Sequence, residues 1–365
     1  MALADDLLTW YDTQAIALPW RMAGHERMPE RAYHVWLSEI MLQQTQVETV
    51  KPYYARFLEA YPTIDDLAAA PLGDVLKLWE GLGYYSRARN LHKAAAQVIE
   101  HFGGKIPESV SELLSLSGVG RYTAGAVASI AYGMREPALD GNVIRVYSRL
   151  FDITDEVSLP ATQAKFWELA ETLLPEARPG DYNQALMDLG RLICKPRAPR
   201  CESCPVQKHC LAYARGVQES RPVKVKKPVT PHYQVTAGLI WNQRGELLIA
   251  QRPLKGLLGG LWEFPGGKQE TGETLTDCLR RELREELNIN VDVGELFTVV
   301  KHAFTHFKIT LHAFTCRYHE GSGEPEAIGV KDWAWVAPGD LERYAFGKAD
   351  RQVIAHLLSR DQMLF

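Results

Sequence analysis

Four of the six cysteines lie in the short stretch CKPRAPRCESCPVQKHC, at Cys194, Cys201, Cys204 and Cys210. Thiolates gathered this closely suit a single metal site, because they are the soft ligands that zinc and iron–sulfur clusters use. A zinc ribbon usually contains two C-x2-C pairs, and only one is present here. Disulfides are disfavoured in a chain that we expect to be cytoplasmic. The stretch therefore predicts one metal site, and Cys278 and Cys316 are expected to be ordinary thiols.

Two carboxyl groups in different surroundings could divide the work of an acid and of an electrostatic stabiliser. Glu39 lies in the apolar stretch WLSEIML, which should raise its pKa and keep it protonated. Asp140 stands before Gly141, Asn142 and an apolar helical stretch, the place of a helix N-cap that favours the anion. From the residues alone, a solvated helix glutamate and a plain capping aspartate are the simpler interpretations.

The stretch LSGVGRYTAGAV contains a turn around Gly118 and Gly120 that opens into an Ala-rich helical stretch carrying Tyr122. Glycines let the backbone bend sharply, and the free N–H groups at a helix start attract anions such as phosphate. The turn is therefore either a phosphate contact or a simple corner between two helices, and the stretch alone does not separate these alternatives.

The chain of 365 residues is long enough for two or three domains. Its formal net charge of -4 hides a basic region, since residues 191–227 contain ten Lys and Arg against two acidic residues, a local charge of +8. Such a region could neutralise several phosphates, although a disordered basic linker has the same composition. The acidic start and the absence of a long apolar run predict a cytoplasmic protein with no membrane contact.

The periodicity of apolar residues changes along the chain. Up to about residue 215 they recur at helical spacing, and no strand is predicted. Residues 216–231 read GVQESRPVKVKKPVTP, which indicates a linker. Beyond them, alternation in 235–241 and the stretches ELLIAQR and KITLHAFTCRY predict strands, with one helix near 275–288. A second domain of mixed α and β structure begins there.

The cysteine spacing resembles the [4Fe-4S] loop of the endonuclease III superfamily of DNA glycosylases. The stretches LPWR, SEIMLQQTQV, GLGYYSRARNLH and NQALMDLG are most similar to the adenine DNA glycosylases of that superfamily. The resemblance implies a multidomain protein with an all-α helix-hairpin-helix glycosylase domain over 1–215, an iron–sulfur loop over 194–210, a linker over 216–231 and an α+β Nudix-like domain over 232–365. The cluster would be structural, shaping a basic loop that contains Lys195, Arg197, Arg200 and Lys208.

In this family the reaction is the excision of adenine mispaired with 8-oxoguanine or guanine in double-stranded DNA. Cleavage of the glycosidic bond requires a protonated base and a stabilised sugar cation, so Glu39 is implied as the acid and Asp140 as the stabiliser, with Asn142 in the same segment. Relatives that also cut the strand carry a lysine in the turn, which forms a Schiff base. Tyr122 stands there instead, so we expect a monofunctional enzyme that leaves an abasic site. We expect the Tyr122 hydroxyl to bond near the sugar or Asp140.

The resemblance also implies residues that hold and read DNA. Gly118 and Gly120 would form the hairpin that grips the backbone, and Gln184 would meet the adenine edge, with Arg21 closing that pocket. Because the target base must leave the stack, other residues fill the gap. The residues implied beside this gap are Gln44, Thr45, Leu82 and Tyr84. The residues implied in the loop that senses 8-oxoguanine are Phe304, Thr305 and His306. The stretch MAGHERMPERA after LPWR is longer than is usual in the family.

The stretch GGKQETGETLTDCLRRELREELNI resembles the Nudix box of nucleoside-diphosphate hydrolases. Its box positions are Gly267, Glu273, Arg281, Glu282, Glu285 and Glu286, with Asn288 in place of a glycine. A divalent cation would relieve the repulsion among these acids, but the neighbouring arginines could do so equally well. Because the adenine glycosylases use this domain to read the lesion, we expect no significant hydrolase activity.

Two other functions fit part of the sequence. A bifunctional glycosylase-lyase is disfavoured by Tyr122 and by the second domain. A non-enzymatic damage-binding protein is disfavoured by the presence of both Glu39 and Asp140. We expect a monomer that associates with the DNA of the nucleoid.

Overall fold

The computed structural model describes residues 2–21, 28–225, 229–319, 321 and 323–361. The chain forms two compact units that do not follow the sequence in two simple halves. The first unit comprises Met1–Ala69 and Asn90–Lys227, and the second comprises Ala70–Arg89 and Pro228–Phe365. Among the described helices, none combines the length and the apolar character needed to cross a lipid bilayer.

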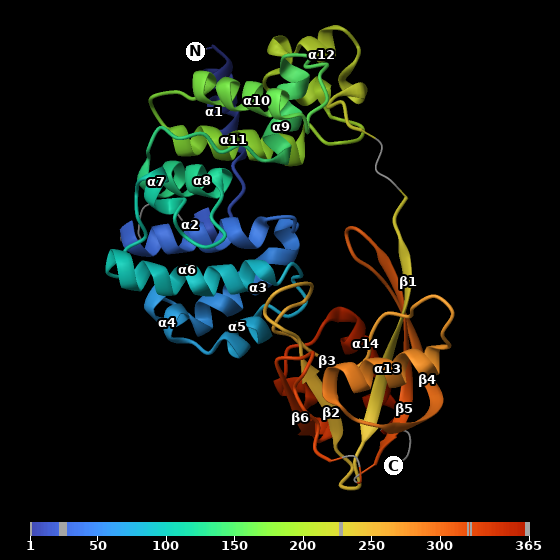
Figure 1. Cartoon of the computed structure of the whole chain (residues 1–365). Helices are drawn as coiled ribbons and strands as arrows, with labels where there is room; N and C mark the ends of the chain where they lie inside the picture. Colours follow the sequence, from blue (N-terminus) through green and yellow to red (C-terminus); the bar gives the residue numbers. More distant parts are fainter. Residues whose placement is uncertain (1, 22–27, 226–228, 320, 322, 362–365) are drawn as a thin grey trace. The chain divides into compact units, whose positions relative to one another are not determined.

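The described part of the first unit is entirely helical, as the periodicity predicts (Figure 1). Short 3-10 turns occur at Pro19–Arg21 (η1), Cys201–Ser203 (η2), Gln207–His209 (η3) and Gln218–Ser220 (η4). The α-helices are α1 (Ala2–Gln14), α2 (Met28–Leu42), α3 (Val47–Ala60), α4 (Ile64–Ala69), α6 (Ser86–Phe102), α7 (Val110–Leu113), α8 (Arg121–Tyr132), α9 (Gly141–Leu150), α10 (Pro160–Leu173), α11 (Pro179–Leu192) and α12 (Leu211–Ala214). Helix α6 begins in the second unit and continues into the first.

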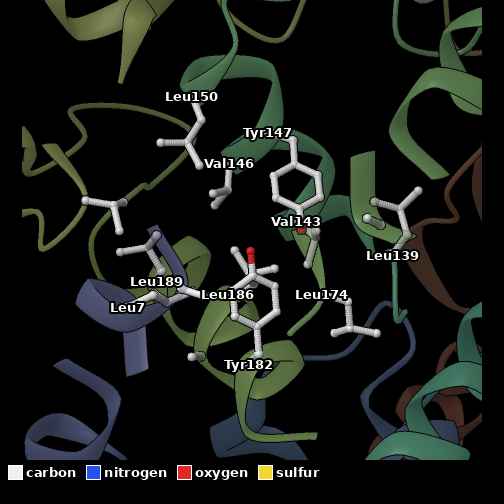
Figure 2. Close-up of a cluster of buried hydrophobic side chains, with 14 of the residues drawn as sticks. Leu7, Leu139, Val143, Val146, Tyr147, Leu150, Leu174, Tyr182, Leu186 and Leu189 are labelled. Carbon is white, nitrogen blue, oxygen red and sulfur yellow. The ribbon is translucent and has the colours of Figure 1, made fainter. Parts of the chain in front are cut away.

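One hydrophobic core of the first unit joins helices that are far apart in the sequence. Figure 2 shows Leu7 of α1, Tyr147 of α9 and Leu186 of α11 among its buried side chains. Tyr182 and Leu189 of α11 are less than 2% exposed in the same cluster. Partly buried cysteines pack against this core, so the predicted metal loop rests on it. Packing of α9 on α11 fixes two of the helices that position the site described below.

The second unit contains a six-stranded mixed sheet with the strand order β3-β2-β1-β5-β4, and β6 also pairs with β2. Strands β1 and β5 are parallel, and the other pairs are antiparallel. The strands are β1 (His232–Trp241), β2 (Leu247–Gln251), β3 (Trp262–Glu263), β4 (Val291–Ala303), β5 (Lys308–Tyr318) and β6 (Asp332–Val336). The strands predicted from alternation, ELLIAQR and KITLHAFTCRY are therefore confirmed as β1, β2 and β5.

A helix covers each face of this sheet. Alternate residues of β1 and β2 enter two separate cores, because successive side chains of a strand point to opposite faces. One core includes Leu283 of α13 (Leu275–Leu287), and the other includes Val353 of α14 (Lys348–Asp361). The remaining helices are α5 (Leu72–Leu78) and the 3-10 helix η6 (Pro338–Arg343). The helix predicted near 275–288 is therefore confirmed.

The predicted linker differs from the structure over its first half. Its residues up to 225 belong to the first unit, where the Arg221 guanidinium pairs with Asp152 at 2.8 Å and Val157 N donates to Val223 O at 3.1 Å. The composition of residues 216–231 predicted a linker that does not pack on either domain, because few of these residues are apolar. Ion pairs and backbone hydrogen bonds hold them instead. Residues 226–228, inside the predicted linker, lie outside the described residues.

Candidate active site

A cavity of about 470 Å³ in the first unit is lined by all four residues predicted to be catalytic, Glu39, Tyr122, Asp140 and Asn142. Glu39 comes from α2, Tyr122 from α8 and Gln184 from α11, while Asp140 precedes α9. Arg21 of the turn η1 completes the set. Residues separated by more than a hundred positions therefore line one space, as the family resemblance implies. Residues 22–27, in the long stretch after LPWR, lie outside the described residues.

Glu39 is held as a buried, partly protonated acid. Its residue is 5% exposed, and the Tyr122 hydroxyl donates a hydrogen bond of 2.5 Å to its Oε2. Burial raises the pKa of Glu39 to about 7, Tyr122 opposes this shift, and the nearby Asp140 adds to it. The Tyr122 hydroxyl therefore bonds Glu39 and not Asp140, which corrects one of the two predicted partners, while its place near the sugar stays a prediction. The helix start directs the tyrosine across the cavity toward α2.

Asp140 is the N-cap of α9, as the sequence predicts. Its Oδ1 accepts from Asn142 N at 2.8 Å and from Val143 N at 2.7 Å, and its Oδ2 accepts from Asn142 Nδ2 at 2.7 Å. Burial nevertheless raises the pKa of Asp140 above its usual value, and these donors only oppose the shift. The expectation that capping alone decides the charge was incomplete, because sequence spacing shows the donors but not the depth of the cavity.

Asn142 links the capping carboxylate to the next helix. Its Oδ1 accepts from Arg145 Nη2 at 2.9 Å, and the same guanidinium donates to Gly190 O at 2.8 Å. A Cβ atom on Gly190 would lie 2.7 Å from Asn142 Cβ, so only glycine fits at this crossing of α9 and α11. The side chain of Asn142 therefore lines the cavity and also holds the Asp140 carboxylate in position.

Arg21 is fixed by a residue that sequence reasoning did not select. Its guanidinium forms two bonds to the Asp188 carboxylate, at 2.5 Å from Nη1 and 3.3 Å from Nη2. Asp188 is 2% exposed and also accepts from Arg191 at 3.1 Å. It lies in the motif NQALMDLG, one turn after Gln184, so helical spacing was the signal that could have identified it. Gln184 itself is 9% exposed and lines the cavity.

The turn between α7 and α8 has the geometry predicted for a helix-hairpin-helix. Gly118 has a φ of 76°, a left-handed value that favours glycine, and a Cβ there would meet Asn90 Cβ at 2.6 Å. Gly120 is the N-cap of α8, so the first N–H groups of that helix follow it directly. In the neighbouring turn after α2, Gln44 is exposed with a φ of 57°, and Thr45 lines the catalytic cavity.

The four clustered cysteines line a single, mainly apolar cavity beside the first core. Burial, and less strongly the neighbouring thiols, raise the pKa of Cys204 to about 12. Such thiols release their protons when a cation binds between them, so this donor set fits a metal cluster. Among the described residues, however, no three His, Cys, Asp or Glu side chains are drawn together as a ligand set. The structure brings Cys194, Cys201, Cys204 and Cys210 around one space.

Two family models match this chain. Residues 37–172 match the HhH-GPD superfamily base excision DNA repair protein, and residues 236–356 match the NUDIX domain. An adenine DNA glycosylase of Rattus norvegicus is 38% identical over 399 residues, covering 96% of this chain and 77% of that protein. The human adenine DNA glycosylase is 39% identical over 366 residues, covering 86% of this chain and 66% of that protein. The chain belongs to the adenine DNA glycosylase family.

A solved structure supports the same fold for the first unit alone. A thermostable thymine-DNA glycosylase matches with a TM-score of 0.52 and 33% identity, covering 59% of this chain and 96% of that protein. The protein is accordingly a DNA glycosylase enzyme of base excision repair, and DNA is its substrate.

In this adenine glycosylase family member, the predicted lesion-sensing residues form the tip of the β4–β5 hairpin. Phe304 N donates to Phe307 O at 2.8 Å, and the two rings lie 4.7 Å apart. Thr305 and His306 are exposed at the tip. A cavity of about 400 Å³ beside the hairpin is lined by Tyr84, Arg89, His302, Thr305, His306 and Lys348, all of the second unit.

Tyr84 and Leu82 differ in accessibility although both are predicted to fill the gap in DNA. Tyr84 is 43% exposed with a φ of 49°, and its hydroxyl lies 2.8 Å from Thr305 Oγ1. Leu82 is only 5% exposed. A buried side chain cannot enter a base stack without rearrangement, so this geometry supports Tyr84 and argues against Leu82.

In the Nudix box of the glycosylase, the arginine forms ion pairs with three of the glutamates. Arg281 contacts the carboxylates of Glu273, Glu282 and Glu285 at 2.9 Å, 3.0 Å and 3.0 Å. Burial raises the pKa of Glu286 to about 8, and its Oε2 has no hydrogen-bond partner among the described residues. Asn288 adopts the left-handed conformation at the helix end, with a φ of 54°, which explains how it replaces the glycine of the pattern.

Proposed function

We propose that this glycosylase releases adenine mispaired with 8-oxoguanine, or with guanine, and leaves an abasic site without cutting the strand. The observation that supports the proposal is the buried Glu39, whose carboxyl group has a raised pKa, accepts a hydrogen bond from Tyr122 and lines a cavity together with Asp140. Tyr122 occupies the turn position from which a lysine would attack the sugar, and a phenol cannot form a Schiff base.

The reaction follows from the two carboxyl groups. Protonated Glu39 transfers its proton to a ring nitrogen of the extruded adenine, so the electrons of the breaking C1′–N9 bond leave with a neutral base. The Asp140 carboxylate stabilises the positive charge that develops on the sugar. Water then adds to C1′, and its proton returns to Glu39. Gln184 orients the adenine edge, and Arg21, held by Asp188, closes the pocket.

The base opposite adenine is read by the β4–β5 hairpin of the second unit. Thr305 and His306 offer a hydroxyl and an imidazole to the edge that distinguishes 8-oxoguanine from guanine. Phe304 stabilises the hairpin through its backbone bond to Phe307. Tyr84 of the second unit acts as a wedge residue in the base stack, and in the first unit Gln44, with Thr45 in the same turn after α2, has the corresponding role by family resemblance. The hairpin glycines Gly118 and Gly120 grip the DNA backbone.

A [4Fe-4S] cluster would be held by Cys194, Cys201, Cys204 and Cys210, and it would stabilise the basic loop without taking part in bond cleavage. Arg197 and Arg200 of that loop are exposed and available to phosphates. The enzyme acts as a monomer on double-stranded DNA at the nucleoid.

A duplex with one A:8-oxoguanine pair tests the reaction. We expect strand breakage only after alkali, and loss of at least about a hundredfold in rate for Glu39→Gln and Asp140→Asn, the usual range for removal of an acid–base group. The exposed Glu59→Gln is the matched control and should keep full activity. Breakage without alkali, with an adduct trapped by borohydride, would instead assign a lyase. Preferential release of thymine from a T:G duplex would overturn the adenine assignment.

The reading loop has a separate test. Phe304→Ala and His306→Ala should lose the preference for A:8-oxoguanine over A:G while adenine release from A:G continues. Equal losses on both duplexes would assign these residues to folding of the hairpin.

A further inference from the structure

The segment 70–89 contains α5 and a tightly bonded loop that ends in Tyr84. Gly83 O accepts from Trp79 Nε1 at 3.1 Å and from Arg87 Nη2 at 2.9 Å. Gly81 N donates to the Tyr85 hydroxyl at 3.0 Å. These hydrogen bonds lie within the loop and make it rigid, so a displacement of its first residues also displaces Tyr84.

Glu80, at the start of this loop, joins the segment to the rest of the second unit. Its Oε1 accepts from Phe346 N at 2.7 Å and from Arg351 Nε at 2.6 Å. Its Oε2 accepts from Lys77 Nζ at 2.9 Å. The Glu80 side chain is 18% exposed, so these charge-assisted bonds are partly shielded from water.

The partners of Glu80 belong to a rigid part of the sheet domain. Phe346 is fully buried and packs against Phe264 with ring centroids 5.9 Å apart. Arg351 extends from α14 and also donates to Tyr344 O at 2.8 Å. Ala345 O accepts from Trp262 N of β3 at 2.8 Å. Glu80 is thus bonded to a strand-like segment that the core holds in place.

Other hydrogen bonds also join this segment to the rest of the second unit, and Lys77 Nζ, which pairs with Glu80, donates one of them to Tyr344 O at 3.1 Å. Arg89 donates to Gly259 O at 2.6 Å, a contact with a neutral carbonyl of a loop. The Tyr84 hydroxyl meets Thr305 at the exposed hairpin tip. The Arg89 bond is partly buried but ends on a single neutral carbonyl, and the neutral Tyr84 bond is exposed to competing water, whereas the Glu80 carboxylate has two cations and one N–H within bonding distance.

We propose that Glu80, through Arg351 and the Phe346 backbone, is a positioning residue that aligns Tyr84 with the lesion-reading hairpin. It touches neither adenine nor the reacting sugar. Its effect is on discrimination between opposite bases, and this inference rests on the proposed function, in which Thr305 and His306 read that base.

Single-turnover rates of adenine release from A:8-oxoguanine and A:G duplexes test the proposal. Glu80→Ala and Arg351→Met should each lower the ratio of the two rates by about tenfold or more, as expected for loss of a hydrogen bond to a charged group. The A:G rate should change by less than about twofold. Arg343→Met removes an exposed pair with Asp340 in the same unit and is the matched control. Glu80→Gln retains an acceptor for Phe346 N and should recover part of the ratio.

A double variant separates positioning from general stability. If Glu80 acts through the hairpin, Glu80→Ala combined with Thr305→Val should lower the rate ratio no further than the stronger single variant. Multiplicative effects, or an unchanged ratio in Glu80→Ala and Arg351→Met, would overturn the proposal. A wild-type enzyme without preference for A:8-oxoguanine would instead overturn the proposed reading function, so the two failures are distinct. Thermal unfolding of each variant shows whether the second unit is folded at the assay temperature.

Discussion

In the proposed reaction, one carboxyl group must keep its proton near neutral pH. Glu39 is buried, which favours its neutral form, while Tyr122 donates a hydrogen bond that favours its charged form. The balance places its pKa at about 7. An acid with a pKa near the working pH combines sufficient protonation with sufficient acidity, which suits the protonation of adenine.

This balance predicts the alkaline side of the pH profile. Because Glu39 must be protonated to act, the rate of adenine release should fall as the pH rises through about 7. Single-turnover rates over a pH series, with DNA binding checked at each pH, measure this limb. A rate that stays constant well above pH 7 would show that Glu39 is not the proton donor.

Tyr122 should control where that limb lies. Tyr122→Phe removes the bond that lowers the pKa of Glu39, so the pKa should rise and the alkaline limb should move to higher pH. Tyr132→Phe is a matched control on the same helix, because the Tyr132 hydroxyl bonds Ile106 O instead. A shift to lower pH in Tyr122→Phe would contradict the proposed role of the hydroxyl.

At the scale of elements, a helix can keep the residue pattern of a hydrolase while an arginine pairs with the carboxylates that would bind the metal ion. Helix α13 presents Glu282 and Glu285, and Arg281 bonds both, together with Glu273 before the helix. These bonds neutralise part of the charge that a divalent cation would otherwise neutralise. The helix also packs its apolar face on the sheet, so the pattern contributes to folding whether or not it binds a cation.

We therefore predict that the protein does not hydrolyse 8-oxo-dGTP at a significant rate in Mg²⁺ or Mn²⁺. The measurement is the release of nucleoside monophosphate over time, with an active Nudix hydrolase as the positive control. Turnover that Glu285→Gln abolishes and Glu39→Gln leaves intact would contradict this prediction and assign a second activity to the chain.

At the scale of the whole molecule, the first unit depends on a cysteine loop packed against its core. Cys194, Cys204 and Cys210 contact the hydrophobic cluster formed by α1, α9 and α11. The same loop carries exposed basic residues. A cluster held by these thiols would therefore affect DNA binding through the shape of the loop, at a distance from Glu39.

This arrangement predicts that the purified protein is brown and contains iron. Cys204→Ser should lose the iron and bind DNA more weakly, with a smaller effect on the rate of the DNA that it does bind. Metal analysis and a DNA titration measure both effects, and Cys316→Ala, on β5 of the other unit, should keep its iron. Zinc near one atom per chain in place of iron would show that the cluster assignment is wrong.

The sequence by itself determined the local chemistry of this protein. Residue types and spacing predicted the all-helical first part, the strands and helix of the second, and the capping position of Asp140, because these features depend on neighbours along the chain. Motif resemblance predicted the family, and the relatives confirm it. The individual site roles stay predictions until they are tested by substitution.

Only the tertiary structure decided features that arise between distant segments. No local sequence pattern relates Tyr122 to Glu39 or Arg21 to Asp188, although each pair is hydrogen-bonded. The burial of Leu82 likewise depends on packing and not on its neighbours along the chain. The assignment of 70–89 to the second unit has the same origin, since Glu80 finds its partners more than two hundred and fifty positions later. Burial and long-range hydrogen bonds set these pKa values and positions, and both depend on how the chain packs as a whole.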